Sequence, residues 1–337
     1  MTGAARASSA LVDTTLVHEG VPGIALQGDR VRLTVFPVAG AKILNLVHRA
    51  SGYDLLWQNP RVPLRATYPG ASFDDIWCGG WDELFPTDGA CELDGNRFHD
   101  HGDLWFGPWE WSVDADDGTE ATISMRRQTV ALPCLMERSI TITRDGLDVV
   151  FEHRLTNLGT QPIPFCWNIH VAHAIAAGSR LHLPTARLGL EPPDTGRFGA
   201  VDEIAWPQHG DTDLSVALGR DAGITEFLYA RGLTDGWCAV THPEAGVGLA
   251  LAFATDVFRT VWSWGVFGGW RGHHVLLTEP ATSPPGGLAR SVAEGTAAQL
   301  AAGATLQTRV VASVLEGIDP GRRGDEHPTR DRSATRP

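Results

Sequence analysis

Alternation of apolar and polar residues with a period of two is the feature that most limits how this chain can fold. Val31, Leu33 and Val35 alternate with arginine and threonine, and Ile140 and Ile142 alternate with threonines. This period places successive side chains on opposite faces of a strand, so that one face is buried and the other is wet. Helical periodicity over ten or more residues is hard to find. The pattern predicts an all-β protein.

Further segments extend this prediction. Residues 147–151 alternate in the same way, whereas Leu249–Phe253 and Thr308–Val314 are continuous apolar runs. Continuous runs of this length are typical of strands near the centre of a sheet. The dipeptides at 145–146 and 117–118 are both Asp-Gly, which supplies the positive-φ residues of tight hairpins.

The length of 337 residues fits either two domains or one large β domain. No internal repeat and no linker divides the middle of the chain. We therefore expect a large single-domain antiparallel β-sandwich over residues 16–318. Residues 1–15 read as a flexible N-terminal leader, and the charged segment 319–337 reads as a disordered tail.

Charge and composition exclude several classes of function. Forty acidic against 27 basic residues give a net charge of −13, which argues against a nucleic-acid partner. No segment approaches 18 apolar residues and no signal peptide is apparent, so no membrane partner is expected. The cysteines are odd in number and form no C-x-x-C pair, which indicates reduced packing residues and a cytoplasmic protein. They are Cys78, Cys91, Cys134, Cys166 and Cys238.

The common cofactor and nucleophile motifs are absent from the sequence. It contains no P-loop, no dinucleotide-binding glycine motif, no G-x-S-x-G and no H-E-x-x-H. Nucleotide hydrolysis, hydride transfer, serine hydrolysis and zincin proteolysis therefore lose support. An Asp-rich segment at 114–118 lacks the spacing of a calcium loop and reads as a solvated turn.

Polar and aromatic residues gather instead in three regions. Glu279 follows the apolar run Val275–Leu277 and precedes a proline, and burial there would raise its pKa toward that of a general base. His170 lies in an apolar and aromatic stretch. Each residue alone also fits a purely structural role: Glu279 as a solvated glutamate at the end of a strand, and His170 as a histidine of the core. The regions are Gly79–Thr87 with His99–Trp109, Pro164–His173, and Thr278–Pro285.

Taken together, these segments resemble the aldose 1-epimerase (galactose mutarotase) family and its wider superfamily. The likeness spans roughly residues 31–314, and its short motifs agree in order and spacing. They are Gly40–Leu46, Gly52–Trp57, the block at 79–86, His101-Gly102, Thr156–Gly159 with Pro162 and Pro164, His170, and Glu279-Pro280. The resemblance implies the galactose mutarotase-like supersandwich fold.

The resemblance also implies roles for individual residues. His170 falls on the family's general acid, Glu279 on its general base, and His101 on the histidine that holds the sugar near its ring oxygen. The activity implied is interconversion of the anomers of a free aldose. Opening a pyranose needs one proton delivered to the ring oxygen and another removed from the anomeric hydroxyl, which suits a histidine and a carboxylate. No cofactor and no metal are required.

Substrate contacts are expected from the tryptophans and carboxylates of the motif block. Indole faces pack against the C–H faces of a sugar, and carboxylates accept its hydroxyl protons. For any one tryptophan, the competing interpretation is that it fills the core. The candidates are Trp81, Asp82, Glu83 and Trp105, with Trp167, Trp264 and Trp270 in reserve.

The sequence departs from the family in three places. Many relatives have an arginine shortly after the histidine-glycine pair, where this chain has Asp103–Phe106, which argues against a phosphorylated substrate. Val171–His173 replaces an aromatic pair that usually follows the second histidine. The family's substrate-binding aspartate has no assignable counterpart within residues 188–235.

Two other functions remain open at this point. A non-catalytic sugar-binding or regulatory protein could use the same scaffold, because fold does not fix function. A metal-dependent sugar-modifying enzyme is the third hypothesis, since His99 and His101 share a strand face and His173 follows His170 by three residues. The sequence does not indicate which sugar is bound or what the oligomeric state is.

Overall fold

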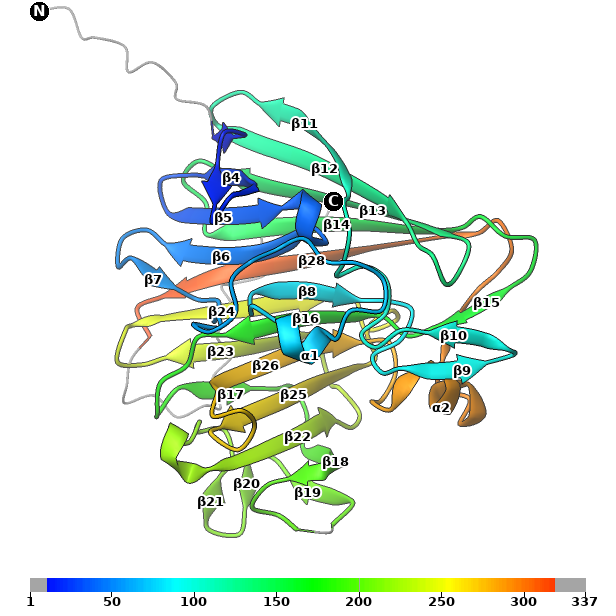
Figure 1. The fold of residues 1–337 in the computed structure, drawn as a ribbon. Coiled ribbons are helices and arrows are strands. Elements are labelled where there is room, and N and C mark those ends of the chain that lie inside the picture. The colour runs from blue at the N-terminus through cyan, green and yellow to red at the C-terminus, as the bar shows by residue number, and fades with distance from the viewer. Residues whose placement is uncertain (1–10, 200, 319–337) are drawn as a thin grey trace, which may run out of the picture.

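Two antiparallel sheets stacked face to face form the body of the molecule (Figure 1). The computed structural model describes residues 11–199 and 201–318. Every strand pair in these residues is antiparallel, and the two large sheets contain twelve and eight strands. The predicted all-β sandwich is confirmed.

The twelve-stranded sheet carries most of the residues singled out above. In spatial order its strands are β1 (Val12–Asp13), β4 (Ile24–Gln27), β5 (Val31–Phe36), β6 (Lys42–His48), β8 (Trp81–Leu84), β16 (Asn168–His173), β26 (His274–Ala281), β25 (Thr260–Phe267), β22 (Ile224–Ala230), β18 (Arg187–Thr195) and β19 (Glu203–Ala205), with β7 (Tyr53–Asp54) paired to β6.

The eight-stranded sheet covers one face of the first. Its strands, in spatial order, are β11 (Glu110–Asp116), β12 (Glu120–Gln128), β13 (Cys134–Thr143), β14 (Asp148–Asn157), β28 (Thr305–Glu316), β24 (Val247–Phe253), β23 (Trp237–His242) and β17 (Arg180–His182). The two continuous apolar runs of the sequence form β24 and β28, which lie in the middle of this sheet as predicted.

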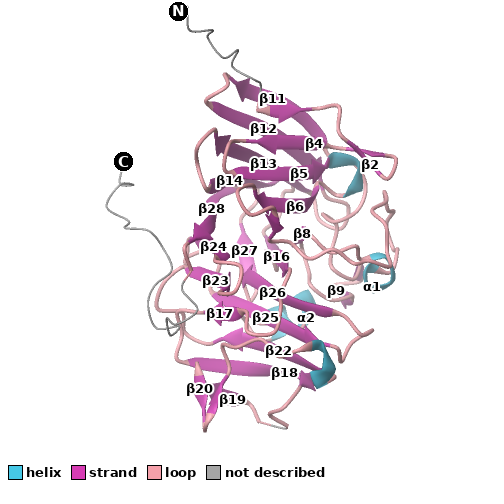
Figure 2. Cartoon of the chain, turned by 90° about the vertical axis from the view of Figure 1, so that its left-hand side faces the viewer, coloured by secondary structure: helices cyan, strands magenta, loops and turns pink. Residues whose placement is uncertain are grey.

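Short elements decorate the sandwich. Figure 2 shows α1 on the outer side of the twelve-stranded sheet, away from β24 and β28. The short elements are the strand pairs β2 (Val17–His18) with β3 (Val21–Pro22), β9 (Cys91–Leu93) with β10 (Asn96–Phe98), β15 (Ile163–Phe165) with β27 (Ala298–Leu300) and β20 (Gln208–His209) with β21 (Thr212–Asp213), and the helices α1 (Phe73–Ile76), α2 (Gly287–Ala293), η1 (Pro37–Ala39) and η2 (Arg220–Ala222).

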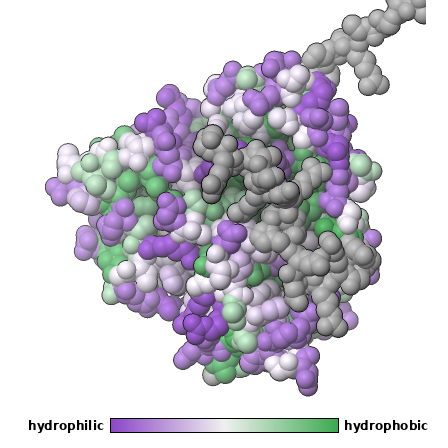
Figure 3. Space-filling model, turned by 180° about the vertical axis from the view of Figure 1, so that it is seen from behind, coloured by the Kyte–Doolittle hydropathy of each residue, from purple (hydrophilic) through white to green (hydrophobic). Residues whose placement is uncertain are grey.

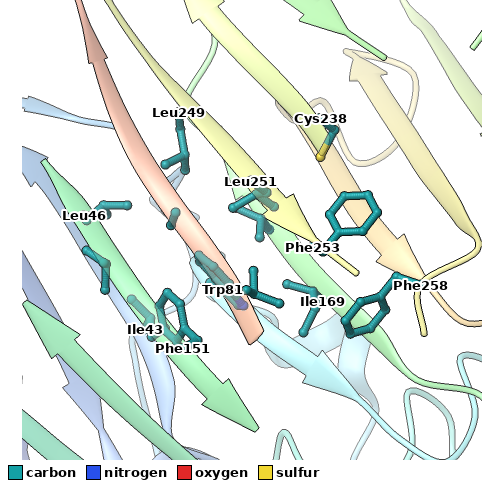
Figure 4. Packing of buried hydrophobic residues seen from close by; sticks show 14 of the residues in the cluster. Ile43, Leu46, Trp81, Phe151, Ile169, Cys238, Leu249, Leu251, Phe253 and Phe258 are labelled. Carbon is teal, nitrogen blue, oxygen red and sulfur yellow. The ribbon is translucent and has the colours of Figure 1, made fainter. Parts of the chain in front are cut away.

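The core lies between the two sheets. In β13, buried residues alternate strictly with half-exposed or exposed ones, so that the strand buries one face, as its sequence predicts. Trp81 of β8 packs on Phe151 of β14 with ring centroids 4.6 Å apart (Figure 4). Each fully buried large apolar side chain contributes roughly 1.5–3 kcal/mol to stability. Figure 3 shows the molecule from behind the view of Figure 1. On this surface, hydrophilic side chains are mixed with scattered hydrophobic ones.

The predicted tight turns differ in detail. Gly118 joins β11 to β12 with a φ of 81°, as expected for the Asp-Gly hairpin. The connection from β13 to β14 uses a wider turn, in which the Gly146 N–H donates to the Thr143 carbonyl at 3.3 Å. Neither residue of that second Asp-Gly pair has a positive φ. The chain reverses there without the left-handed conformation that the sequence predicted.

The first strand begins at an earlier residue than the sequence predicted. Residues 11–15 were predicted to belong to the flexible leader, yet Val12 pairs with Leu26 at the edge of the sheet. The reason is Asp116, whose carboxylate accepts the backbone N–H groups of Leu11 and Val12 at 2.9 and 3.1 Å. The rest of the leader and the predicted tail at 319–337 lie outside the described residues.

All five cysteines are free, and four are buried, as predicted for reduced packing residues. Neither α-helix in the described ranges has the length and apolar character of a membrane span.

Candidate functional site

A cavity of ≈ 270 Å³ opens on the outer face of the twelve-stranded sheet. Figure 1 shows α1 in front of β8 and β16 on this side, and α1 contributes two of the lining residues. Aromatic and acidic side chains dominate the lining. They are Phe73, Asp74, Trp77, Leu84, Asp88, His101, His170, Asp194, Phe227, Trp262, Trp264, Trp270 and Glu279.

The register of the sheet brings the two predicted catalytic residues together. His170 of β16 lies opposite Asp82 of β8, and the pairing of β16 with β26 sets His170 opposite Glu279. Glu279 in turn lies opposite Trp262 of β25. Directly paired residues of neighbouring strands point to the same face. One row of side chains, from four adjacent strands, therefore crosses the sheet beneath the cavity.

Glu279 is almost completely buried, with 4% of its surface exposed. The Asn168 side-chain amide donates to its Oε2 at 3.3 Å. Burial disfavours the charged form and raises the pKa of Glu279 to about 8, although the Asn168 hydrogen bond acts in the opposite direction. The carboxyl group therefore holds its proton at neutral pH.

His170 is equally buried, at 4% exposed. Its ring lies 5.8 Å from the rings of both Phe73 and Trp77. Burial, followed by the positive charges of His101 and Lys42, lowers the pKa of His170 well below its usual value. Its Nδ1 has no hydrogen-bond partner in the described structure. The imidazole is thus neutral and free to exchange a proton.

His101 reaches the same cavity from a loop. Its ring stacks on Phe73 at 3.8 Å, and Asp100 accepts a hydrogen bond from its Nδ1 at 2.8 Å. Burial opposes protonation, but the Asp100 hydrogen bond and the charges of Asp100, Asp74 and Glu279 raise the pKa of His101. The following Gly102 explains the pair in the sequence, since a Cβ there would lie 2.1 Å from the Phe85 carbonyl oxygen.

The three residues of β8 that were predicted to contact the substrate do not line the cavity. Trp81 and Glu83 point between the two sheets and do not line the cavity. Asp82 points to the cavity side, but it is buried and forms an ion pair with Lys42, the only lysine of the chain. Alternation along the strand is the physical reason, because successive residues cannot face the same side.

The remaining tryptophan candidates divide between the cavity and its supports. Trp264 and Trp270, from the reserve group, line the cavity. Trp105 packs edge-on against Phe73 at 5.0 Å, behind the lining. Trp167 lies in the interior, where its indole N–H donates to Glu83 at 3.1 Å.

Comparisons with solved structures identify the fold. No protein-family model and no curated protein matches the sequence. A candidate aldose 1-epimerase from Klebsiella pneumoniae subsp. pneumoniae superposes with a TM-score of 0.71 and 15% identity, over 91% of this chain and 83% of the other. A galactose mutarotase-like protein from Lactobacillus casei gives 0.59 and 17%, over 87% and 99%. A galactose mutarotase-like protein from Clostridium acetobutylicum gives 0.63 and 11%, over 92% and 100%. This chain has the galactose mutarotase-like fold.

Several lining residues of this mutarotase-like fold were not found from the sequence. Asp194 lies within the stretch 188–235, in which no aspartate could be assigned, and it accepts the Trp264 indole N–H at 3.3 Å. Asp74 and Trp77 come from α1 and its C-terminal end, and Trp262 comes from the row beside Glu279. Only strand register and loop placement identify these residues. The one available signal was the Asp-Asp and tryptophan cluster just before Gly79.

The two histidine pairs of the metal hypothesis do not form metal-ligand pairs in the mutarotase-like fold, although His101 and His170, one from each pair, line the same cavity. His99 and His101 lie in a turn after β10 rather than on a strand. His173 points to the opposite face of β16 from His170, where its ring contacts the Thr278 hydroxyl at 2.8 Å. In the described residues, the group of three potential ligand residues whose ligand atoms all lie within 4.8 Å of one another is Asp74, Asp100 and His101.

Proposed function

We propose that the protein is a mutarotase-type isomerase that interconverts the anomers of a free aldose. The observation that carries the proposal is the placement of His170 and Glu279. These groups lie opposite one another on adjacent strands and face one cavity walled by indole rings. Paired groups with opposite pKa shifts are typical of acid–base sites. The fold of the neighbours named above supports the same reaction class.

Each group has one task in the proposed reaction. Glu279 accepts the proton of the anomeric hydroxyl while His170 delivers a proton to the ring oxygen, and the bond from C1 to the ring oxygen breaks. Rotation about the C1–C2 bond turns the other face of the aldehyde toward the ring hydroxyl. The two proton transfers then run in reverse as the ring closes. His101, near the same groups, holds the ring oxygen in this scheme.

The proton count of the pair follows from the pKa shifts. Ring opening starts with one proton shared by the two groups and ends with one proton shared by them. The raised pKa of Glu279 and the lowered pKa of His170 make this singly protonated state the dominant one at neutral pH. The proton resides mostly on Glu279, so the reactive arrangement, with the proton on His170, is its minor tautomer.

The test is anomer exchange measured by NMR magnetisation transfer on a panel of freshly dissolved aldoses. We expect Glu279→Gln to slow exchange by roughly 10²- to 10⁴-fold, the usual contribution of one general acid or base. The matched control is Glu137→Gln, an accessible glutamate of β13 on the other sheet, which should leave the rate unchanged.

Two outcomes would contradict the proposal. Unchanged exchange in Glu279→Gln would exclude this residue from the reaction. Tight binding of aldoses by the wild type without exchange above the uncatalysed rate would favour the sugar-binding protein instead.

A further inference from the structure

Four carboxyl groups line the cavity, and the basic side chains among its lining residues are those of His101 and His170. Asp74, Asp88, Asp194 and Glu279 all line it, whereas none of its lining residues is lysine or arginine. Within residues 11–199 and 201–318, no lysine or arginine nitrogen approaches any of these four carboxylates within the 4.0 Å of an ion pair. The cavity therefore gathers four carboxyl groups without an arginine or lysine partner.

Partial burial disfavours the ionised forms of Asp74 and Asp88 when no ligand is bound. Removal from water raises the pKa of Asp74 and of Asp88. The charge of His101 offsets part of this effect at both residues, as do Arg271 at Asp74 and the backbone N–H groups of Gly286 and Gly287 at Asp88. Nearby positive charge would relieve the same cost. A cationic ligand therefore gains from this environment, and an anionic ligand is repelled.

The walls of the cavity suit the same kind of ligand. Trp77, Trp264 and Trp270 form a group of indoles with ring centroids 5.1 to 6.4 Å apart. Indole faces attract ammonium groups as well as the C–H faces of sugars. The indoles and the acids thus favour one ligand that is both sugar-like and positively charged.

Two buried polar atoms indicate that the cavity is built for a ligand with hydrogen-bonding groups. The Nδ1 of His170 and the indole Nε1 of Trp77 have no partner in the described structure. Both residues line the cavity and are at least 96% buried, with exposures of 4% and 3%. Buried polar atoms in proteins are nearly always satisfied, so that these two are available to a ligand.

We propose that the cavity selects aldoses that carry a protonated amine over neutral aldoses of the same configuration, and that it excludes sugar phosphates and uronic acids. This inference rests on the proposed function and names its substrate class. Asp74, Asp88 and Asp194 supply the selectivity, because Glu279 and His170 are engaged in proton transfer at C1. The ammonium group is not consumed in the reaction, which remains an anomer exchange.

The experiment compares matched sugars that differ in one substituent. Glucosamine, galactosamine and mannosamine are set against glucose, galactose and mannose, against the N-acetylated forms, and against glucose 6-phosphate and glucuronate. At about pH 6, where an amine is protonated, we expect kcat/KM to be at least about 10-fold higher for the best amino sugar than for its parent. Equal or lower values for all three amino sugars would overturn the inference.

Two further readouts separate charge from shape. The ratio of kcat/KM for amino and parent sugar should fall toward one at about pH 9, where the amine loses its proton, and the ionisation of the enzyme cancels in this ratio. Asp194→Asn and Asp88→Asn should lower the ratio at about pH 6, while Asp148→Asn, an exposed position on β14, should not. If the ratio of kcat/KM values stays the same at about pH 9 and in the Asp194→Asn and Asp88→Asn variants, selection by charge is contradicted.

Failure of the proposed function gives a different result. If no aldose is exchanged faster than in buffer, the enzyme proposal fails, and charge selection is then judged by calorimetry with the same sugars. Binding of an amino sugar at least about 10-fold tighter than its parent would uphold the selectivity. Equal binding, or no binding of any amino sugar, would overturn it.

Discussion

At the scale of single residues, the protons of Glu279 and His170 determine when the site can work. The pair must hold one proton, and it loses that proton as the pH rises through the pKa of Glu279, about 8. We therefore expect kcat/KM to fall above pH 8, because neither group can then protonate the ring oxygen. A pH series of anomer exchange on a substrate without a titrating amine, such as glucose, measures this decline of kcat/KM.

The variant Glu279→Gln tests whether the ionisation of Glu279 causes this decline of kcat/KM. Glu279→Gln cannot lose a proton, so its remaining activity should no longer fall near pH 8. A decline of kcat/KM at the same pH in both proteins would assign the ionisation to another group.

At the scale of elements, β8 links the two sheets through its alternate residues. Glu83 points inward, where Arg138 and His153 contact its Oε1 at 2.8 and 2.9 Å, and all three are buried. Burial alone would raise the pKa of Glu83, but the charges of His153 and Arg138 and their hydrogen bonds lower it to about 2. This buried ion pair is structural and lies on the far side of the sheet from the cavity.

Removing that charge should destabilise the fold. We expect Glu83→Gln to cost about 3–5 kcal/mol at pH 7, because it leaves the Arg138 guanidinium buried without its partner. A depressed carboxyl pKa contributes stability above the unfolded value of 4.5 that is lost as the pH falls toward 2. The difference between wild type and variant, measured by urea unfolding, should therefore shrink below pH 4.5. A constant difference down to pH 3 would contradict the assignment.

The same strand shows what the sequence could and could not predict. Period-two alternation predicted half-buried strands such as β5 and β13, and two continuous apolar runs predicted the central positions of β24 and β28. It also contained the information that Trp81 and Glu83 oppose Asp82, yet grouping all three by motif hid it. Asp194 and Trp262 could not be found in this way, because their places depend on pairing between strands far apart in sequence.

At the scale of the whole molecule, neutral histidines stabilise the fold only above mildly acidic pH. Burial lowers the pKa of His173 to about 3 and that of His242 to about 4, and it also lowers the pKa of His170. Such groups contribute stability that is complete above the unfolded pKa of 6.5 and is lost as the pH falls toward the folded pKa. Carboxyl groups with a raised pKa act in the opposite direction. The large shift among them is that of Glu279, and Asp54, Asp74, Asp88 and Glu191 have smaller ones, while His273, with a pKa lowered to about 4, acts with the histidines.

The unfolding free energy should therefore fall between pH 6.5 and pH 4. Each of the three buried histidines contributes up to about 1.4 kcal/mol per pH unit. Only Glu279 among the opposing carboxyl groups has a large pKa shift, so we expect the histidines to determine the sign of the slope. Urea unfolding at intervals of pH measures the slope, and His242→Gln should reduce it while His209→Gln, at an exposed position, should not. A slope of zero in the wild type would contradict this account.

The row of side chains across β8, β16, β26 and β25 has a consequence for how this protein can change over time. Each member owes its direction to strand pairing, so that inserting or deleting one residue within β26 would turn Glu279 toward the other sheet. The turns between strands carry no such constraint. Length variation among homologues should consequently accumulate at the strand ends, while the segments 168–173 and 274–281 keep a fixed length.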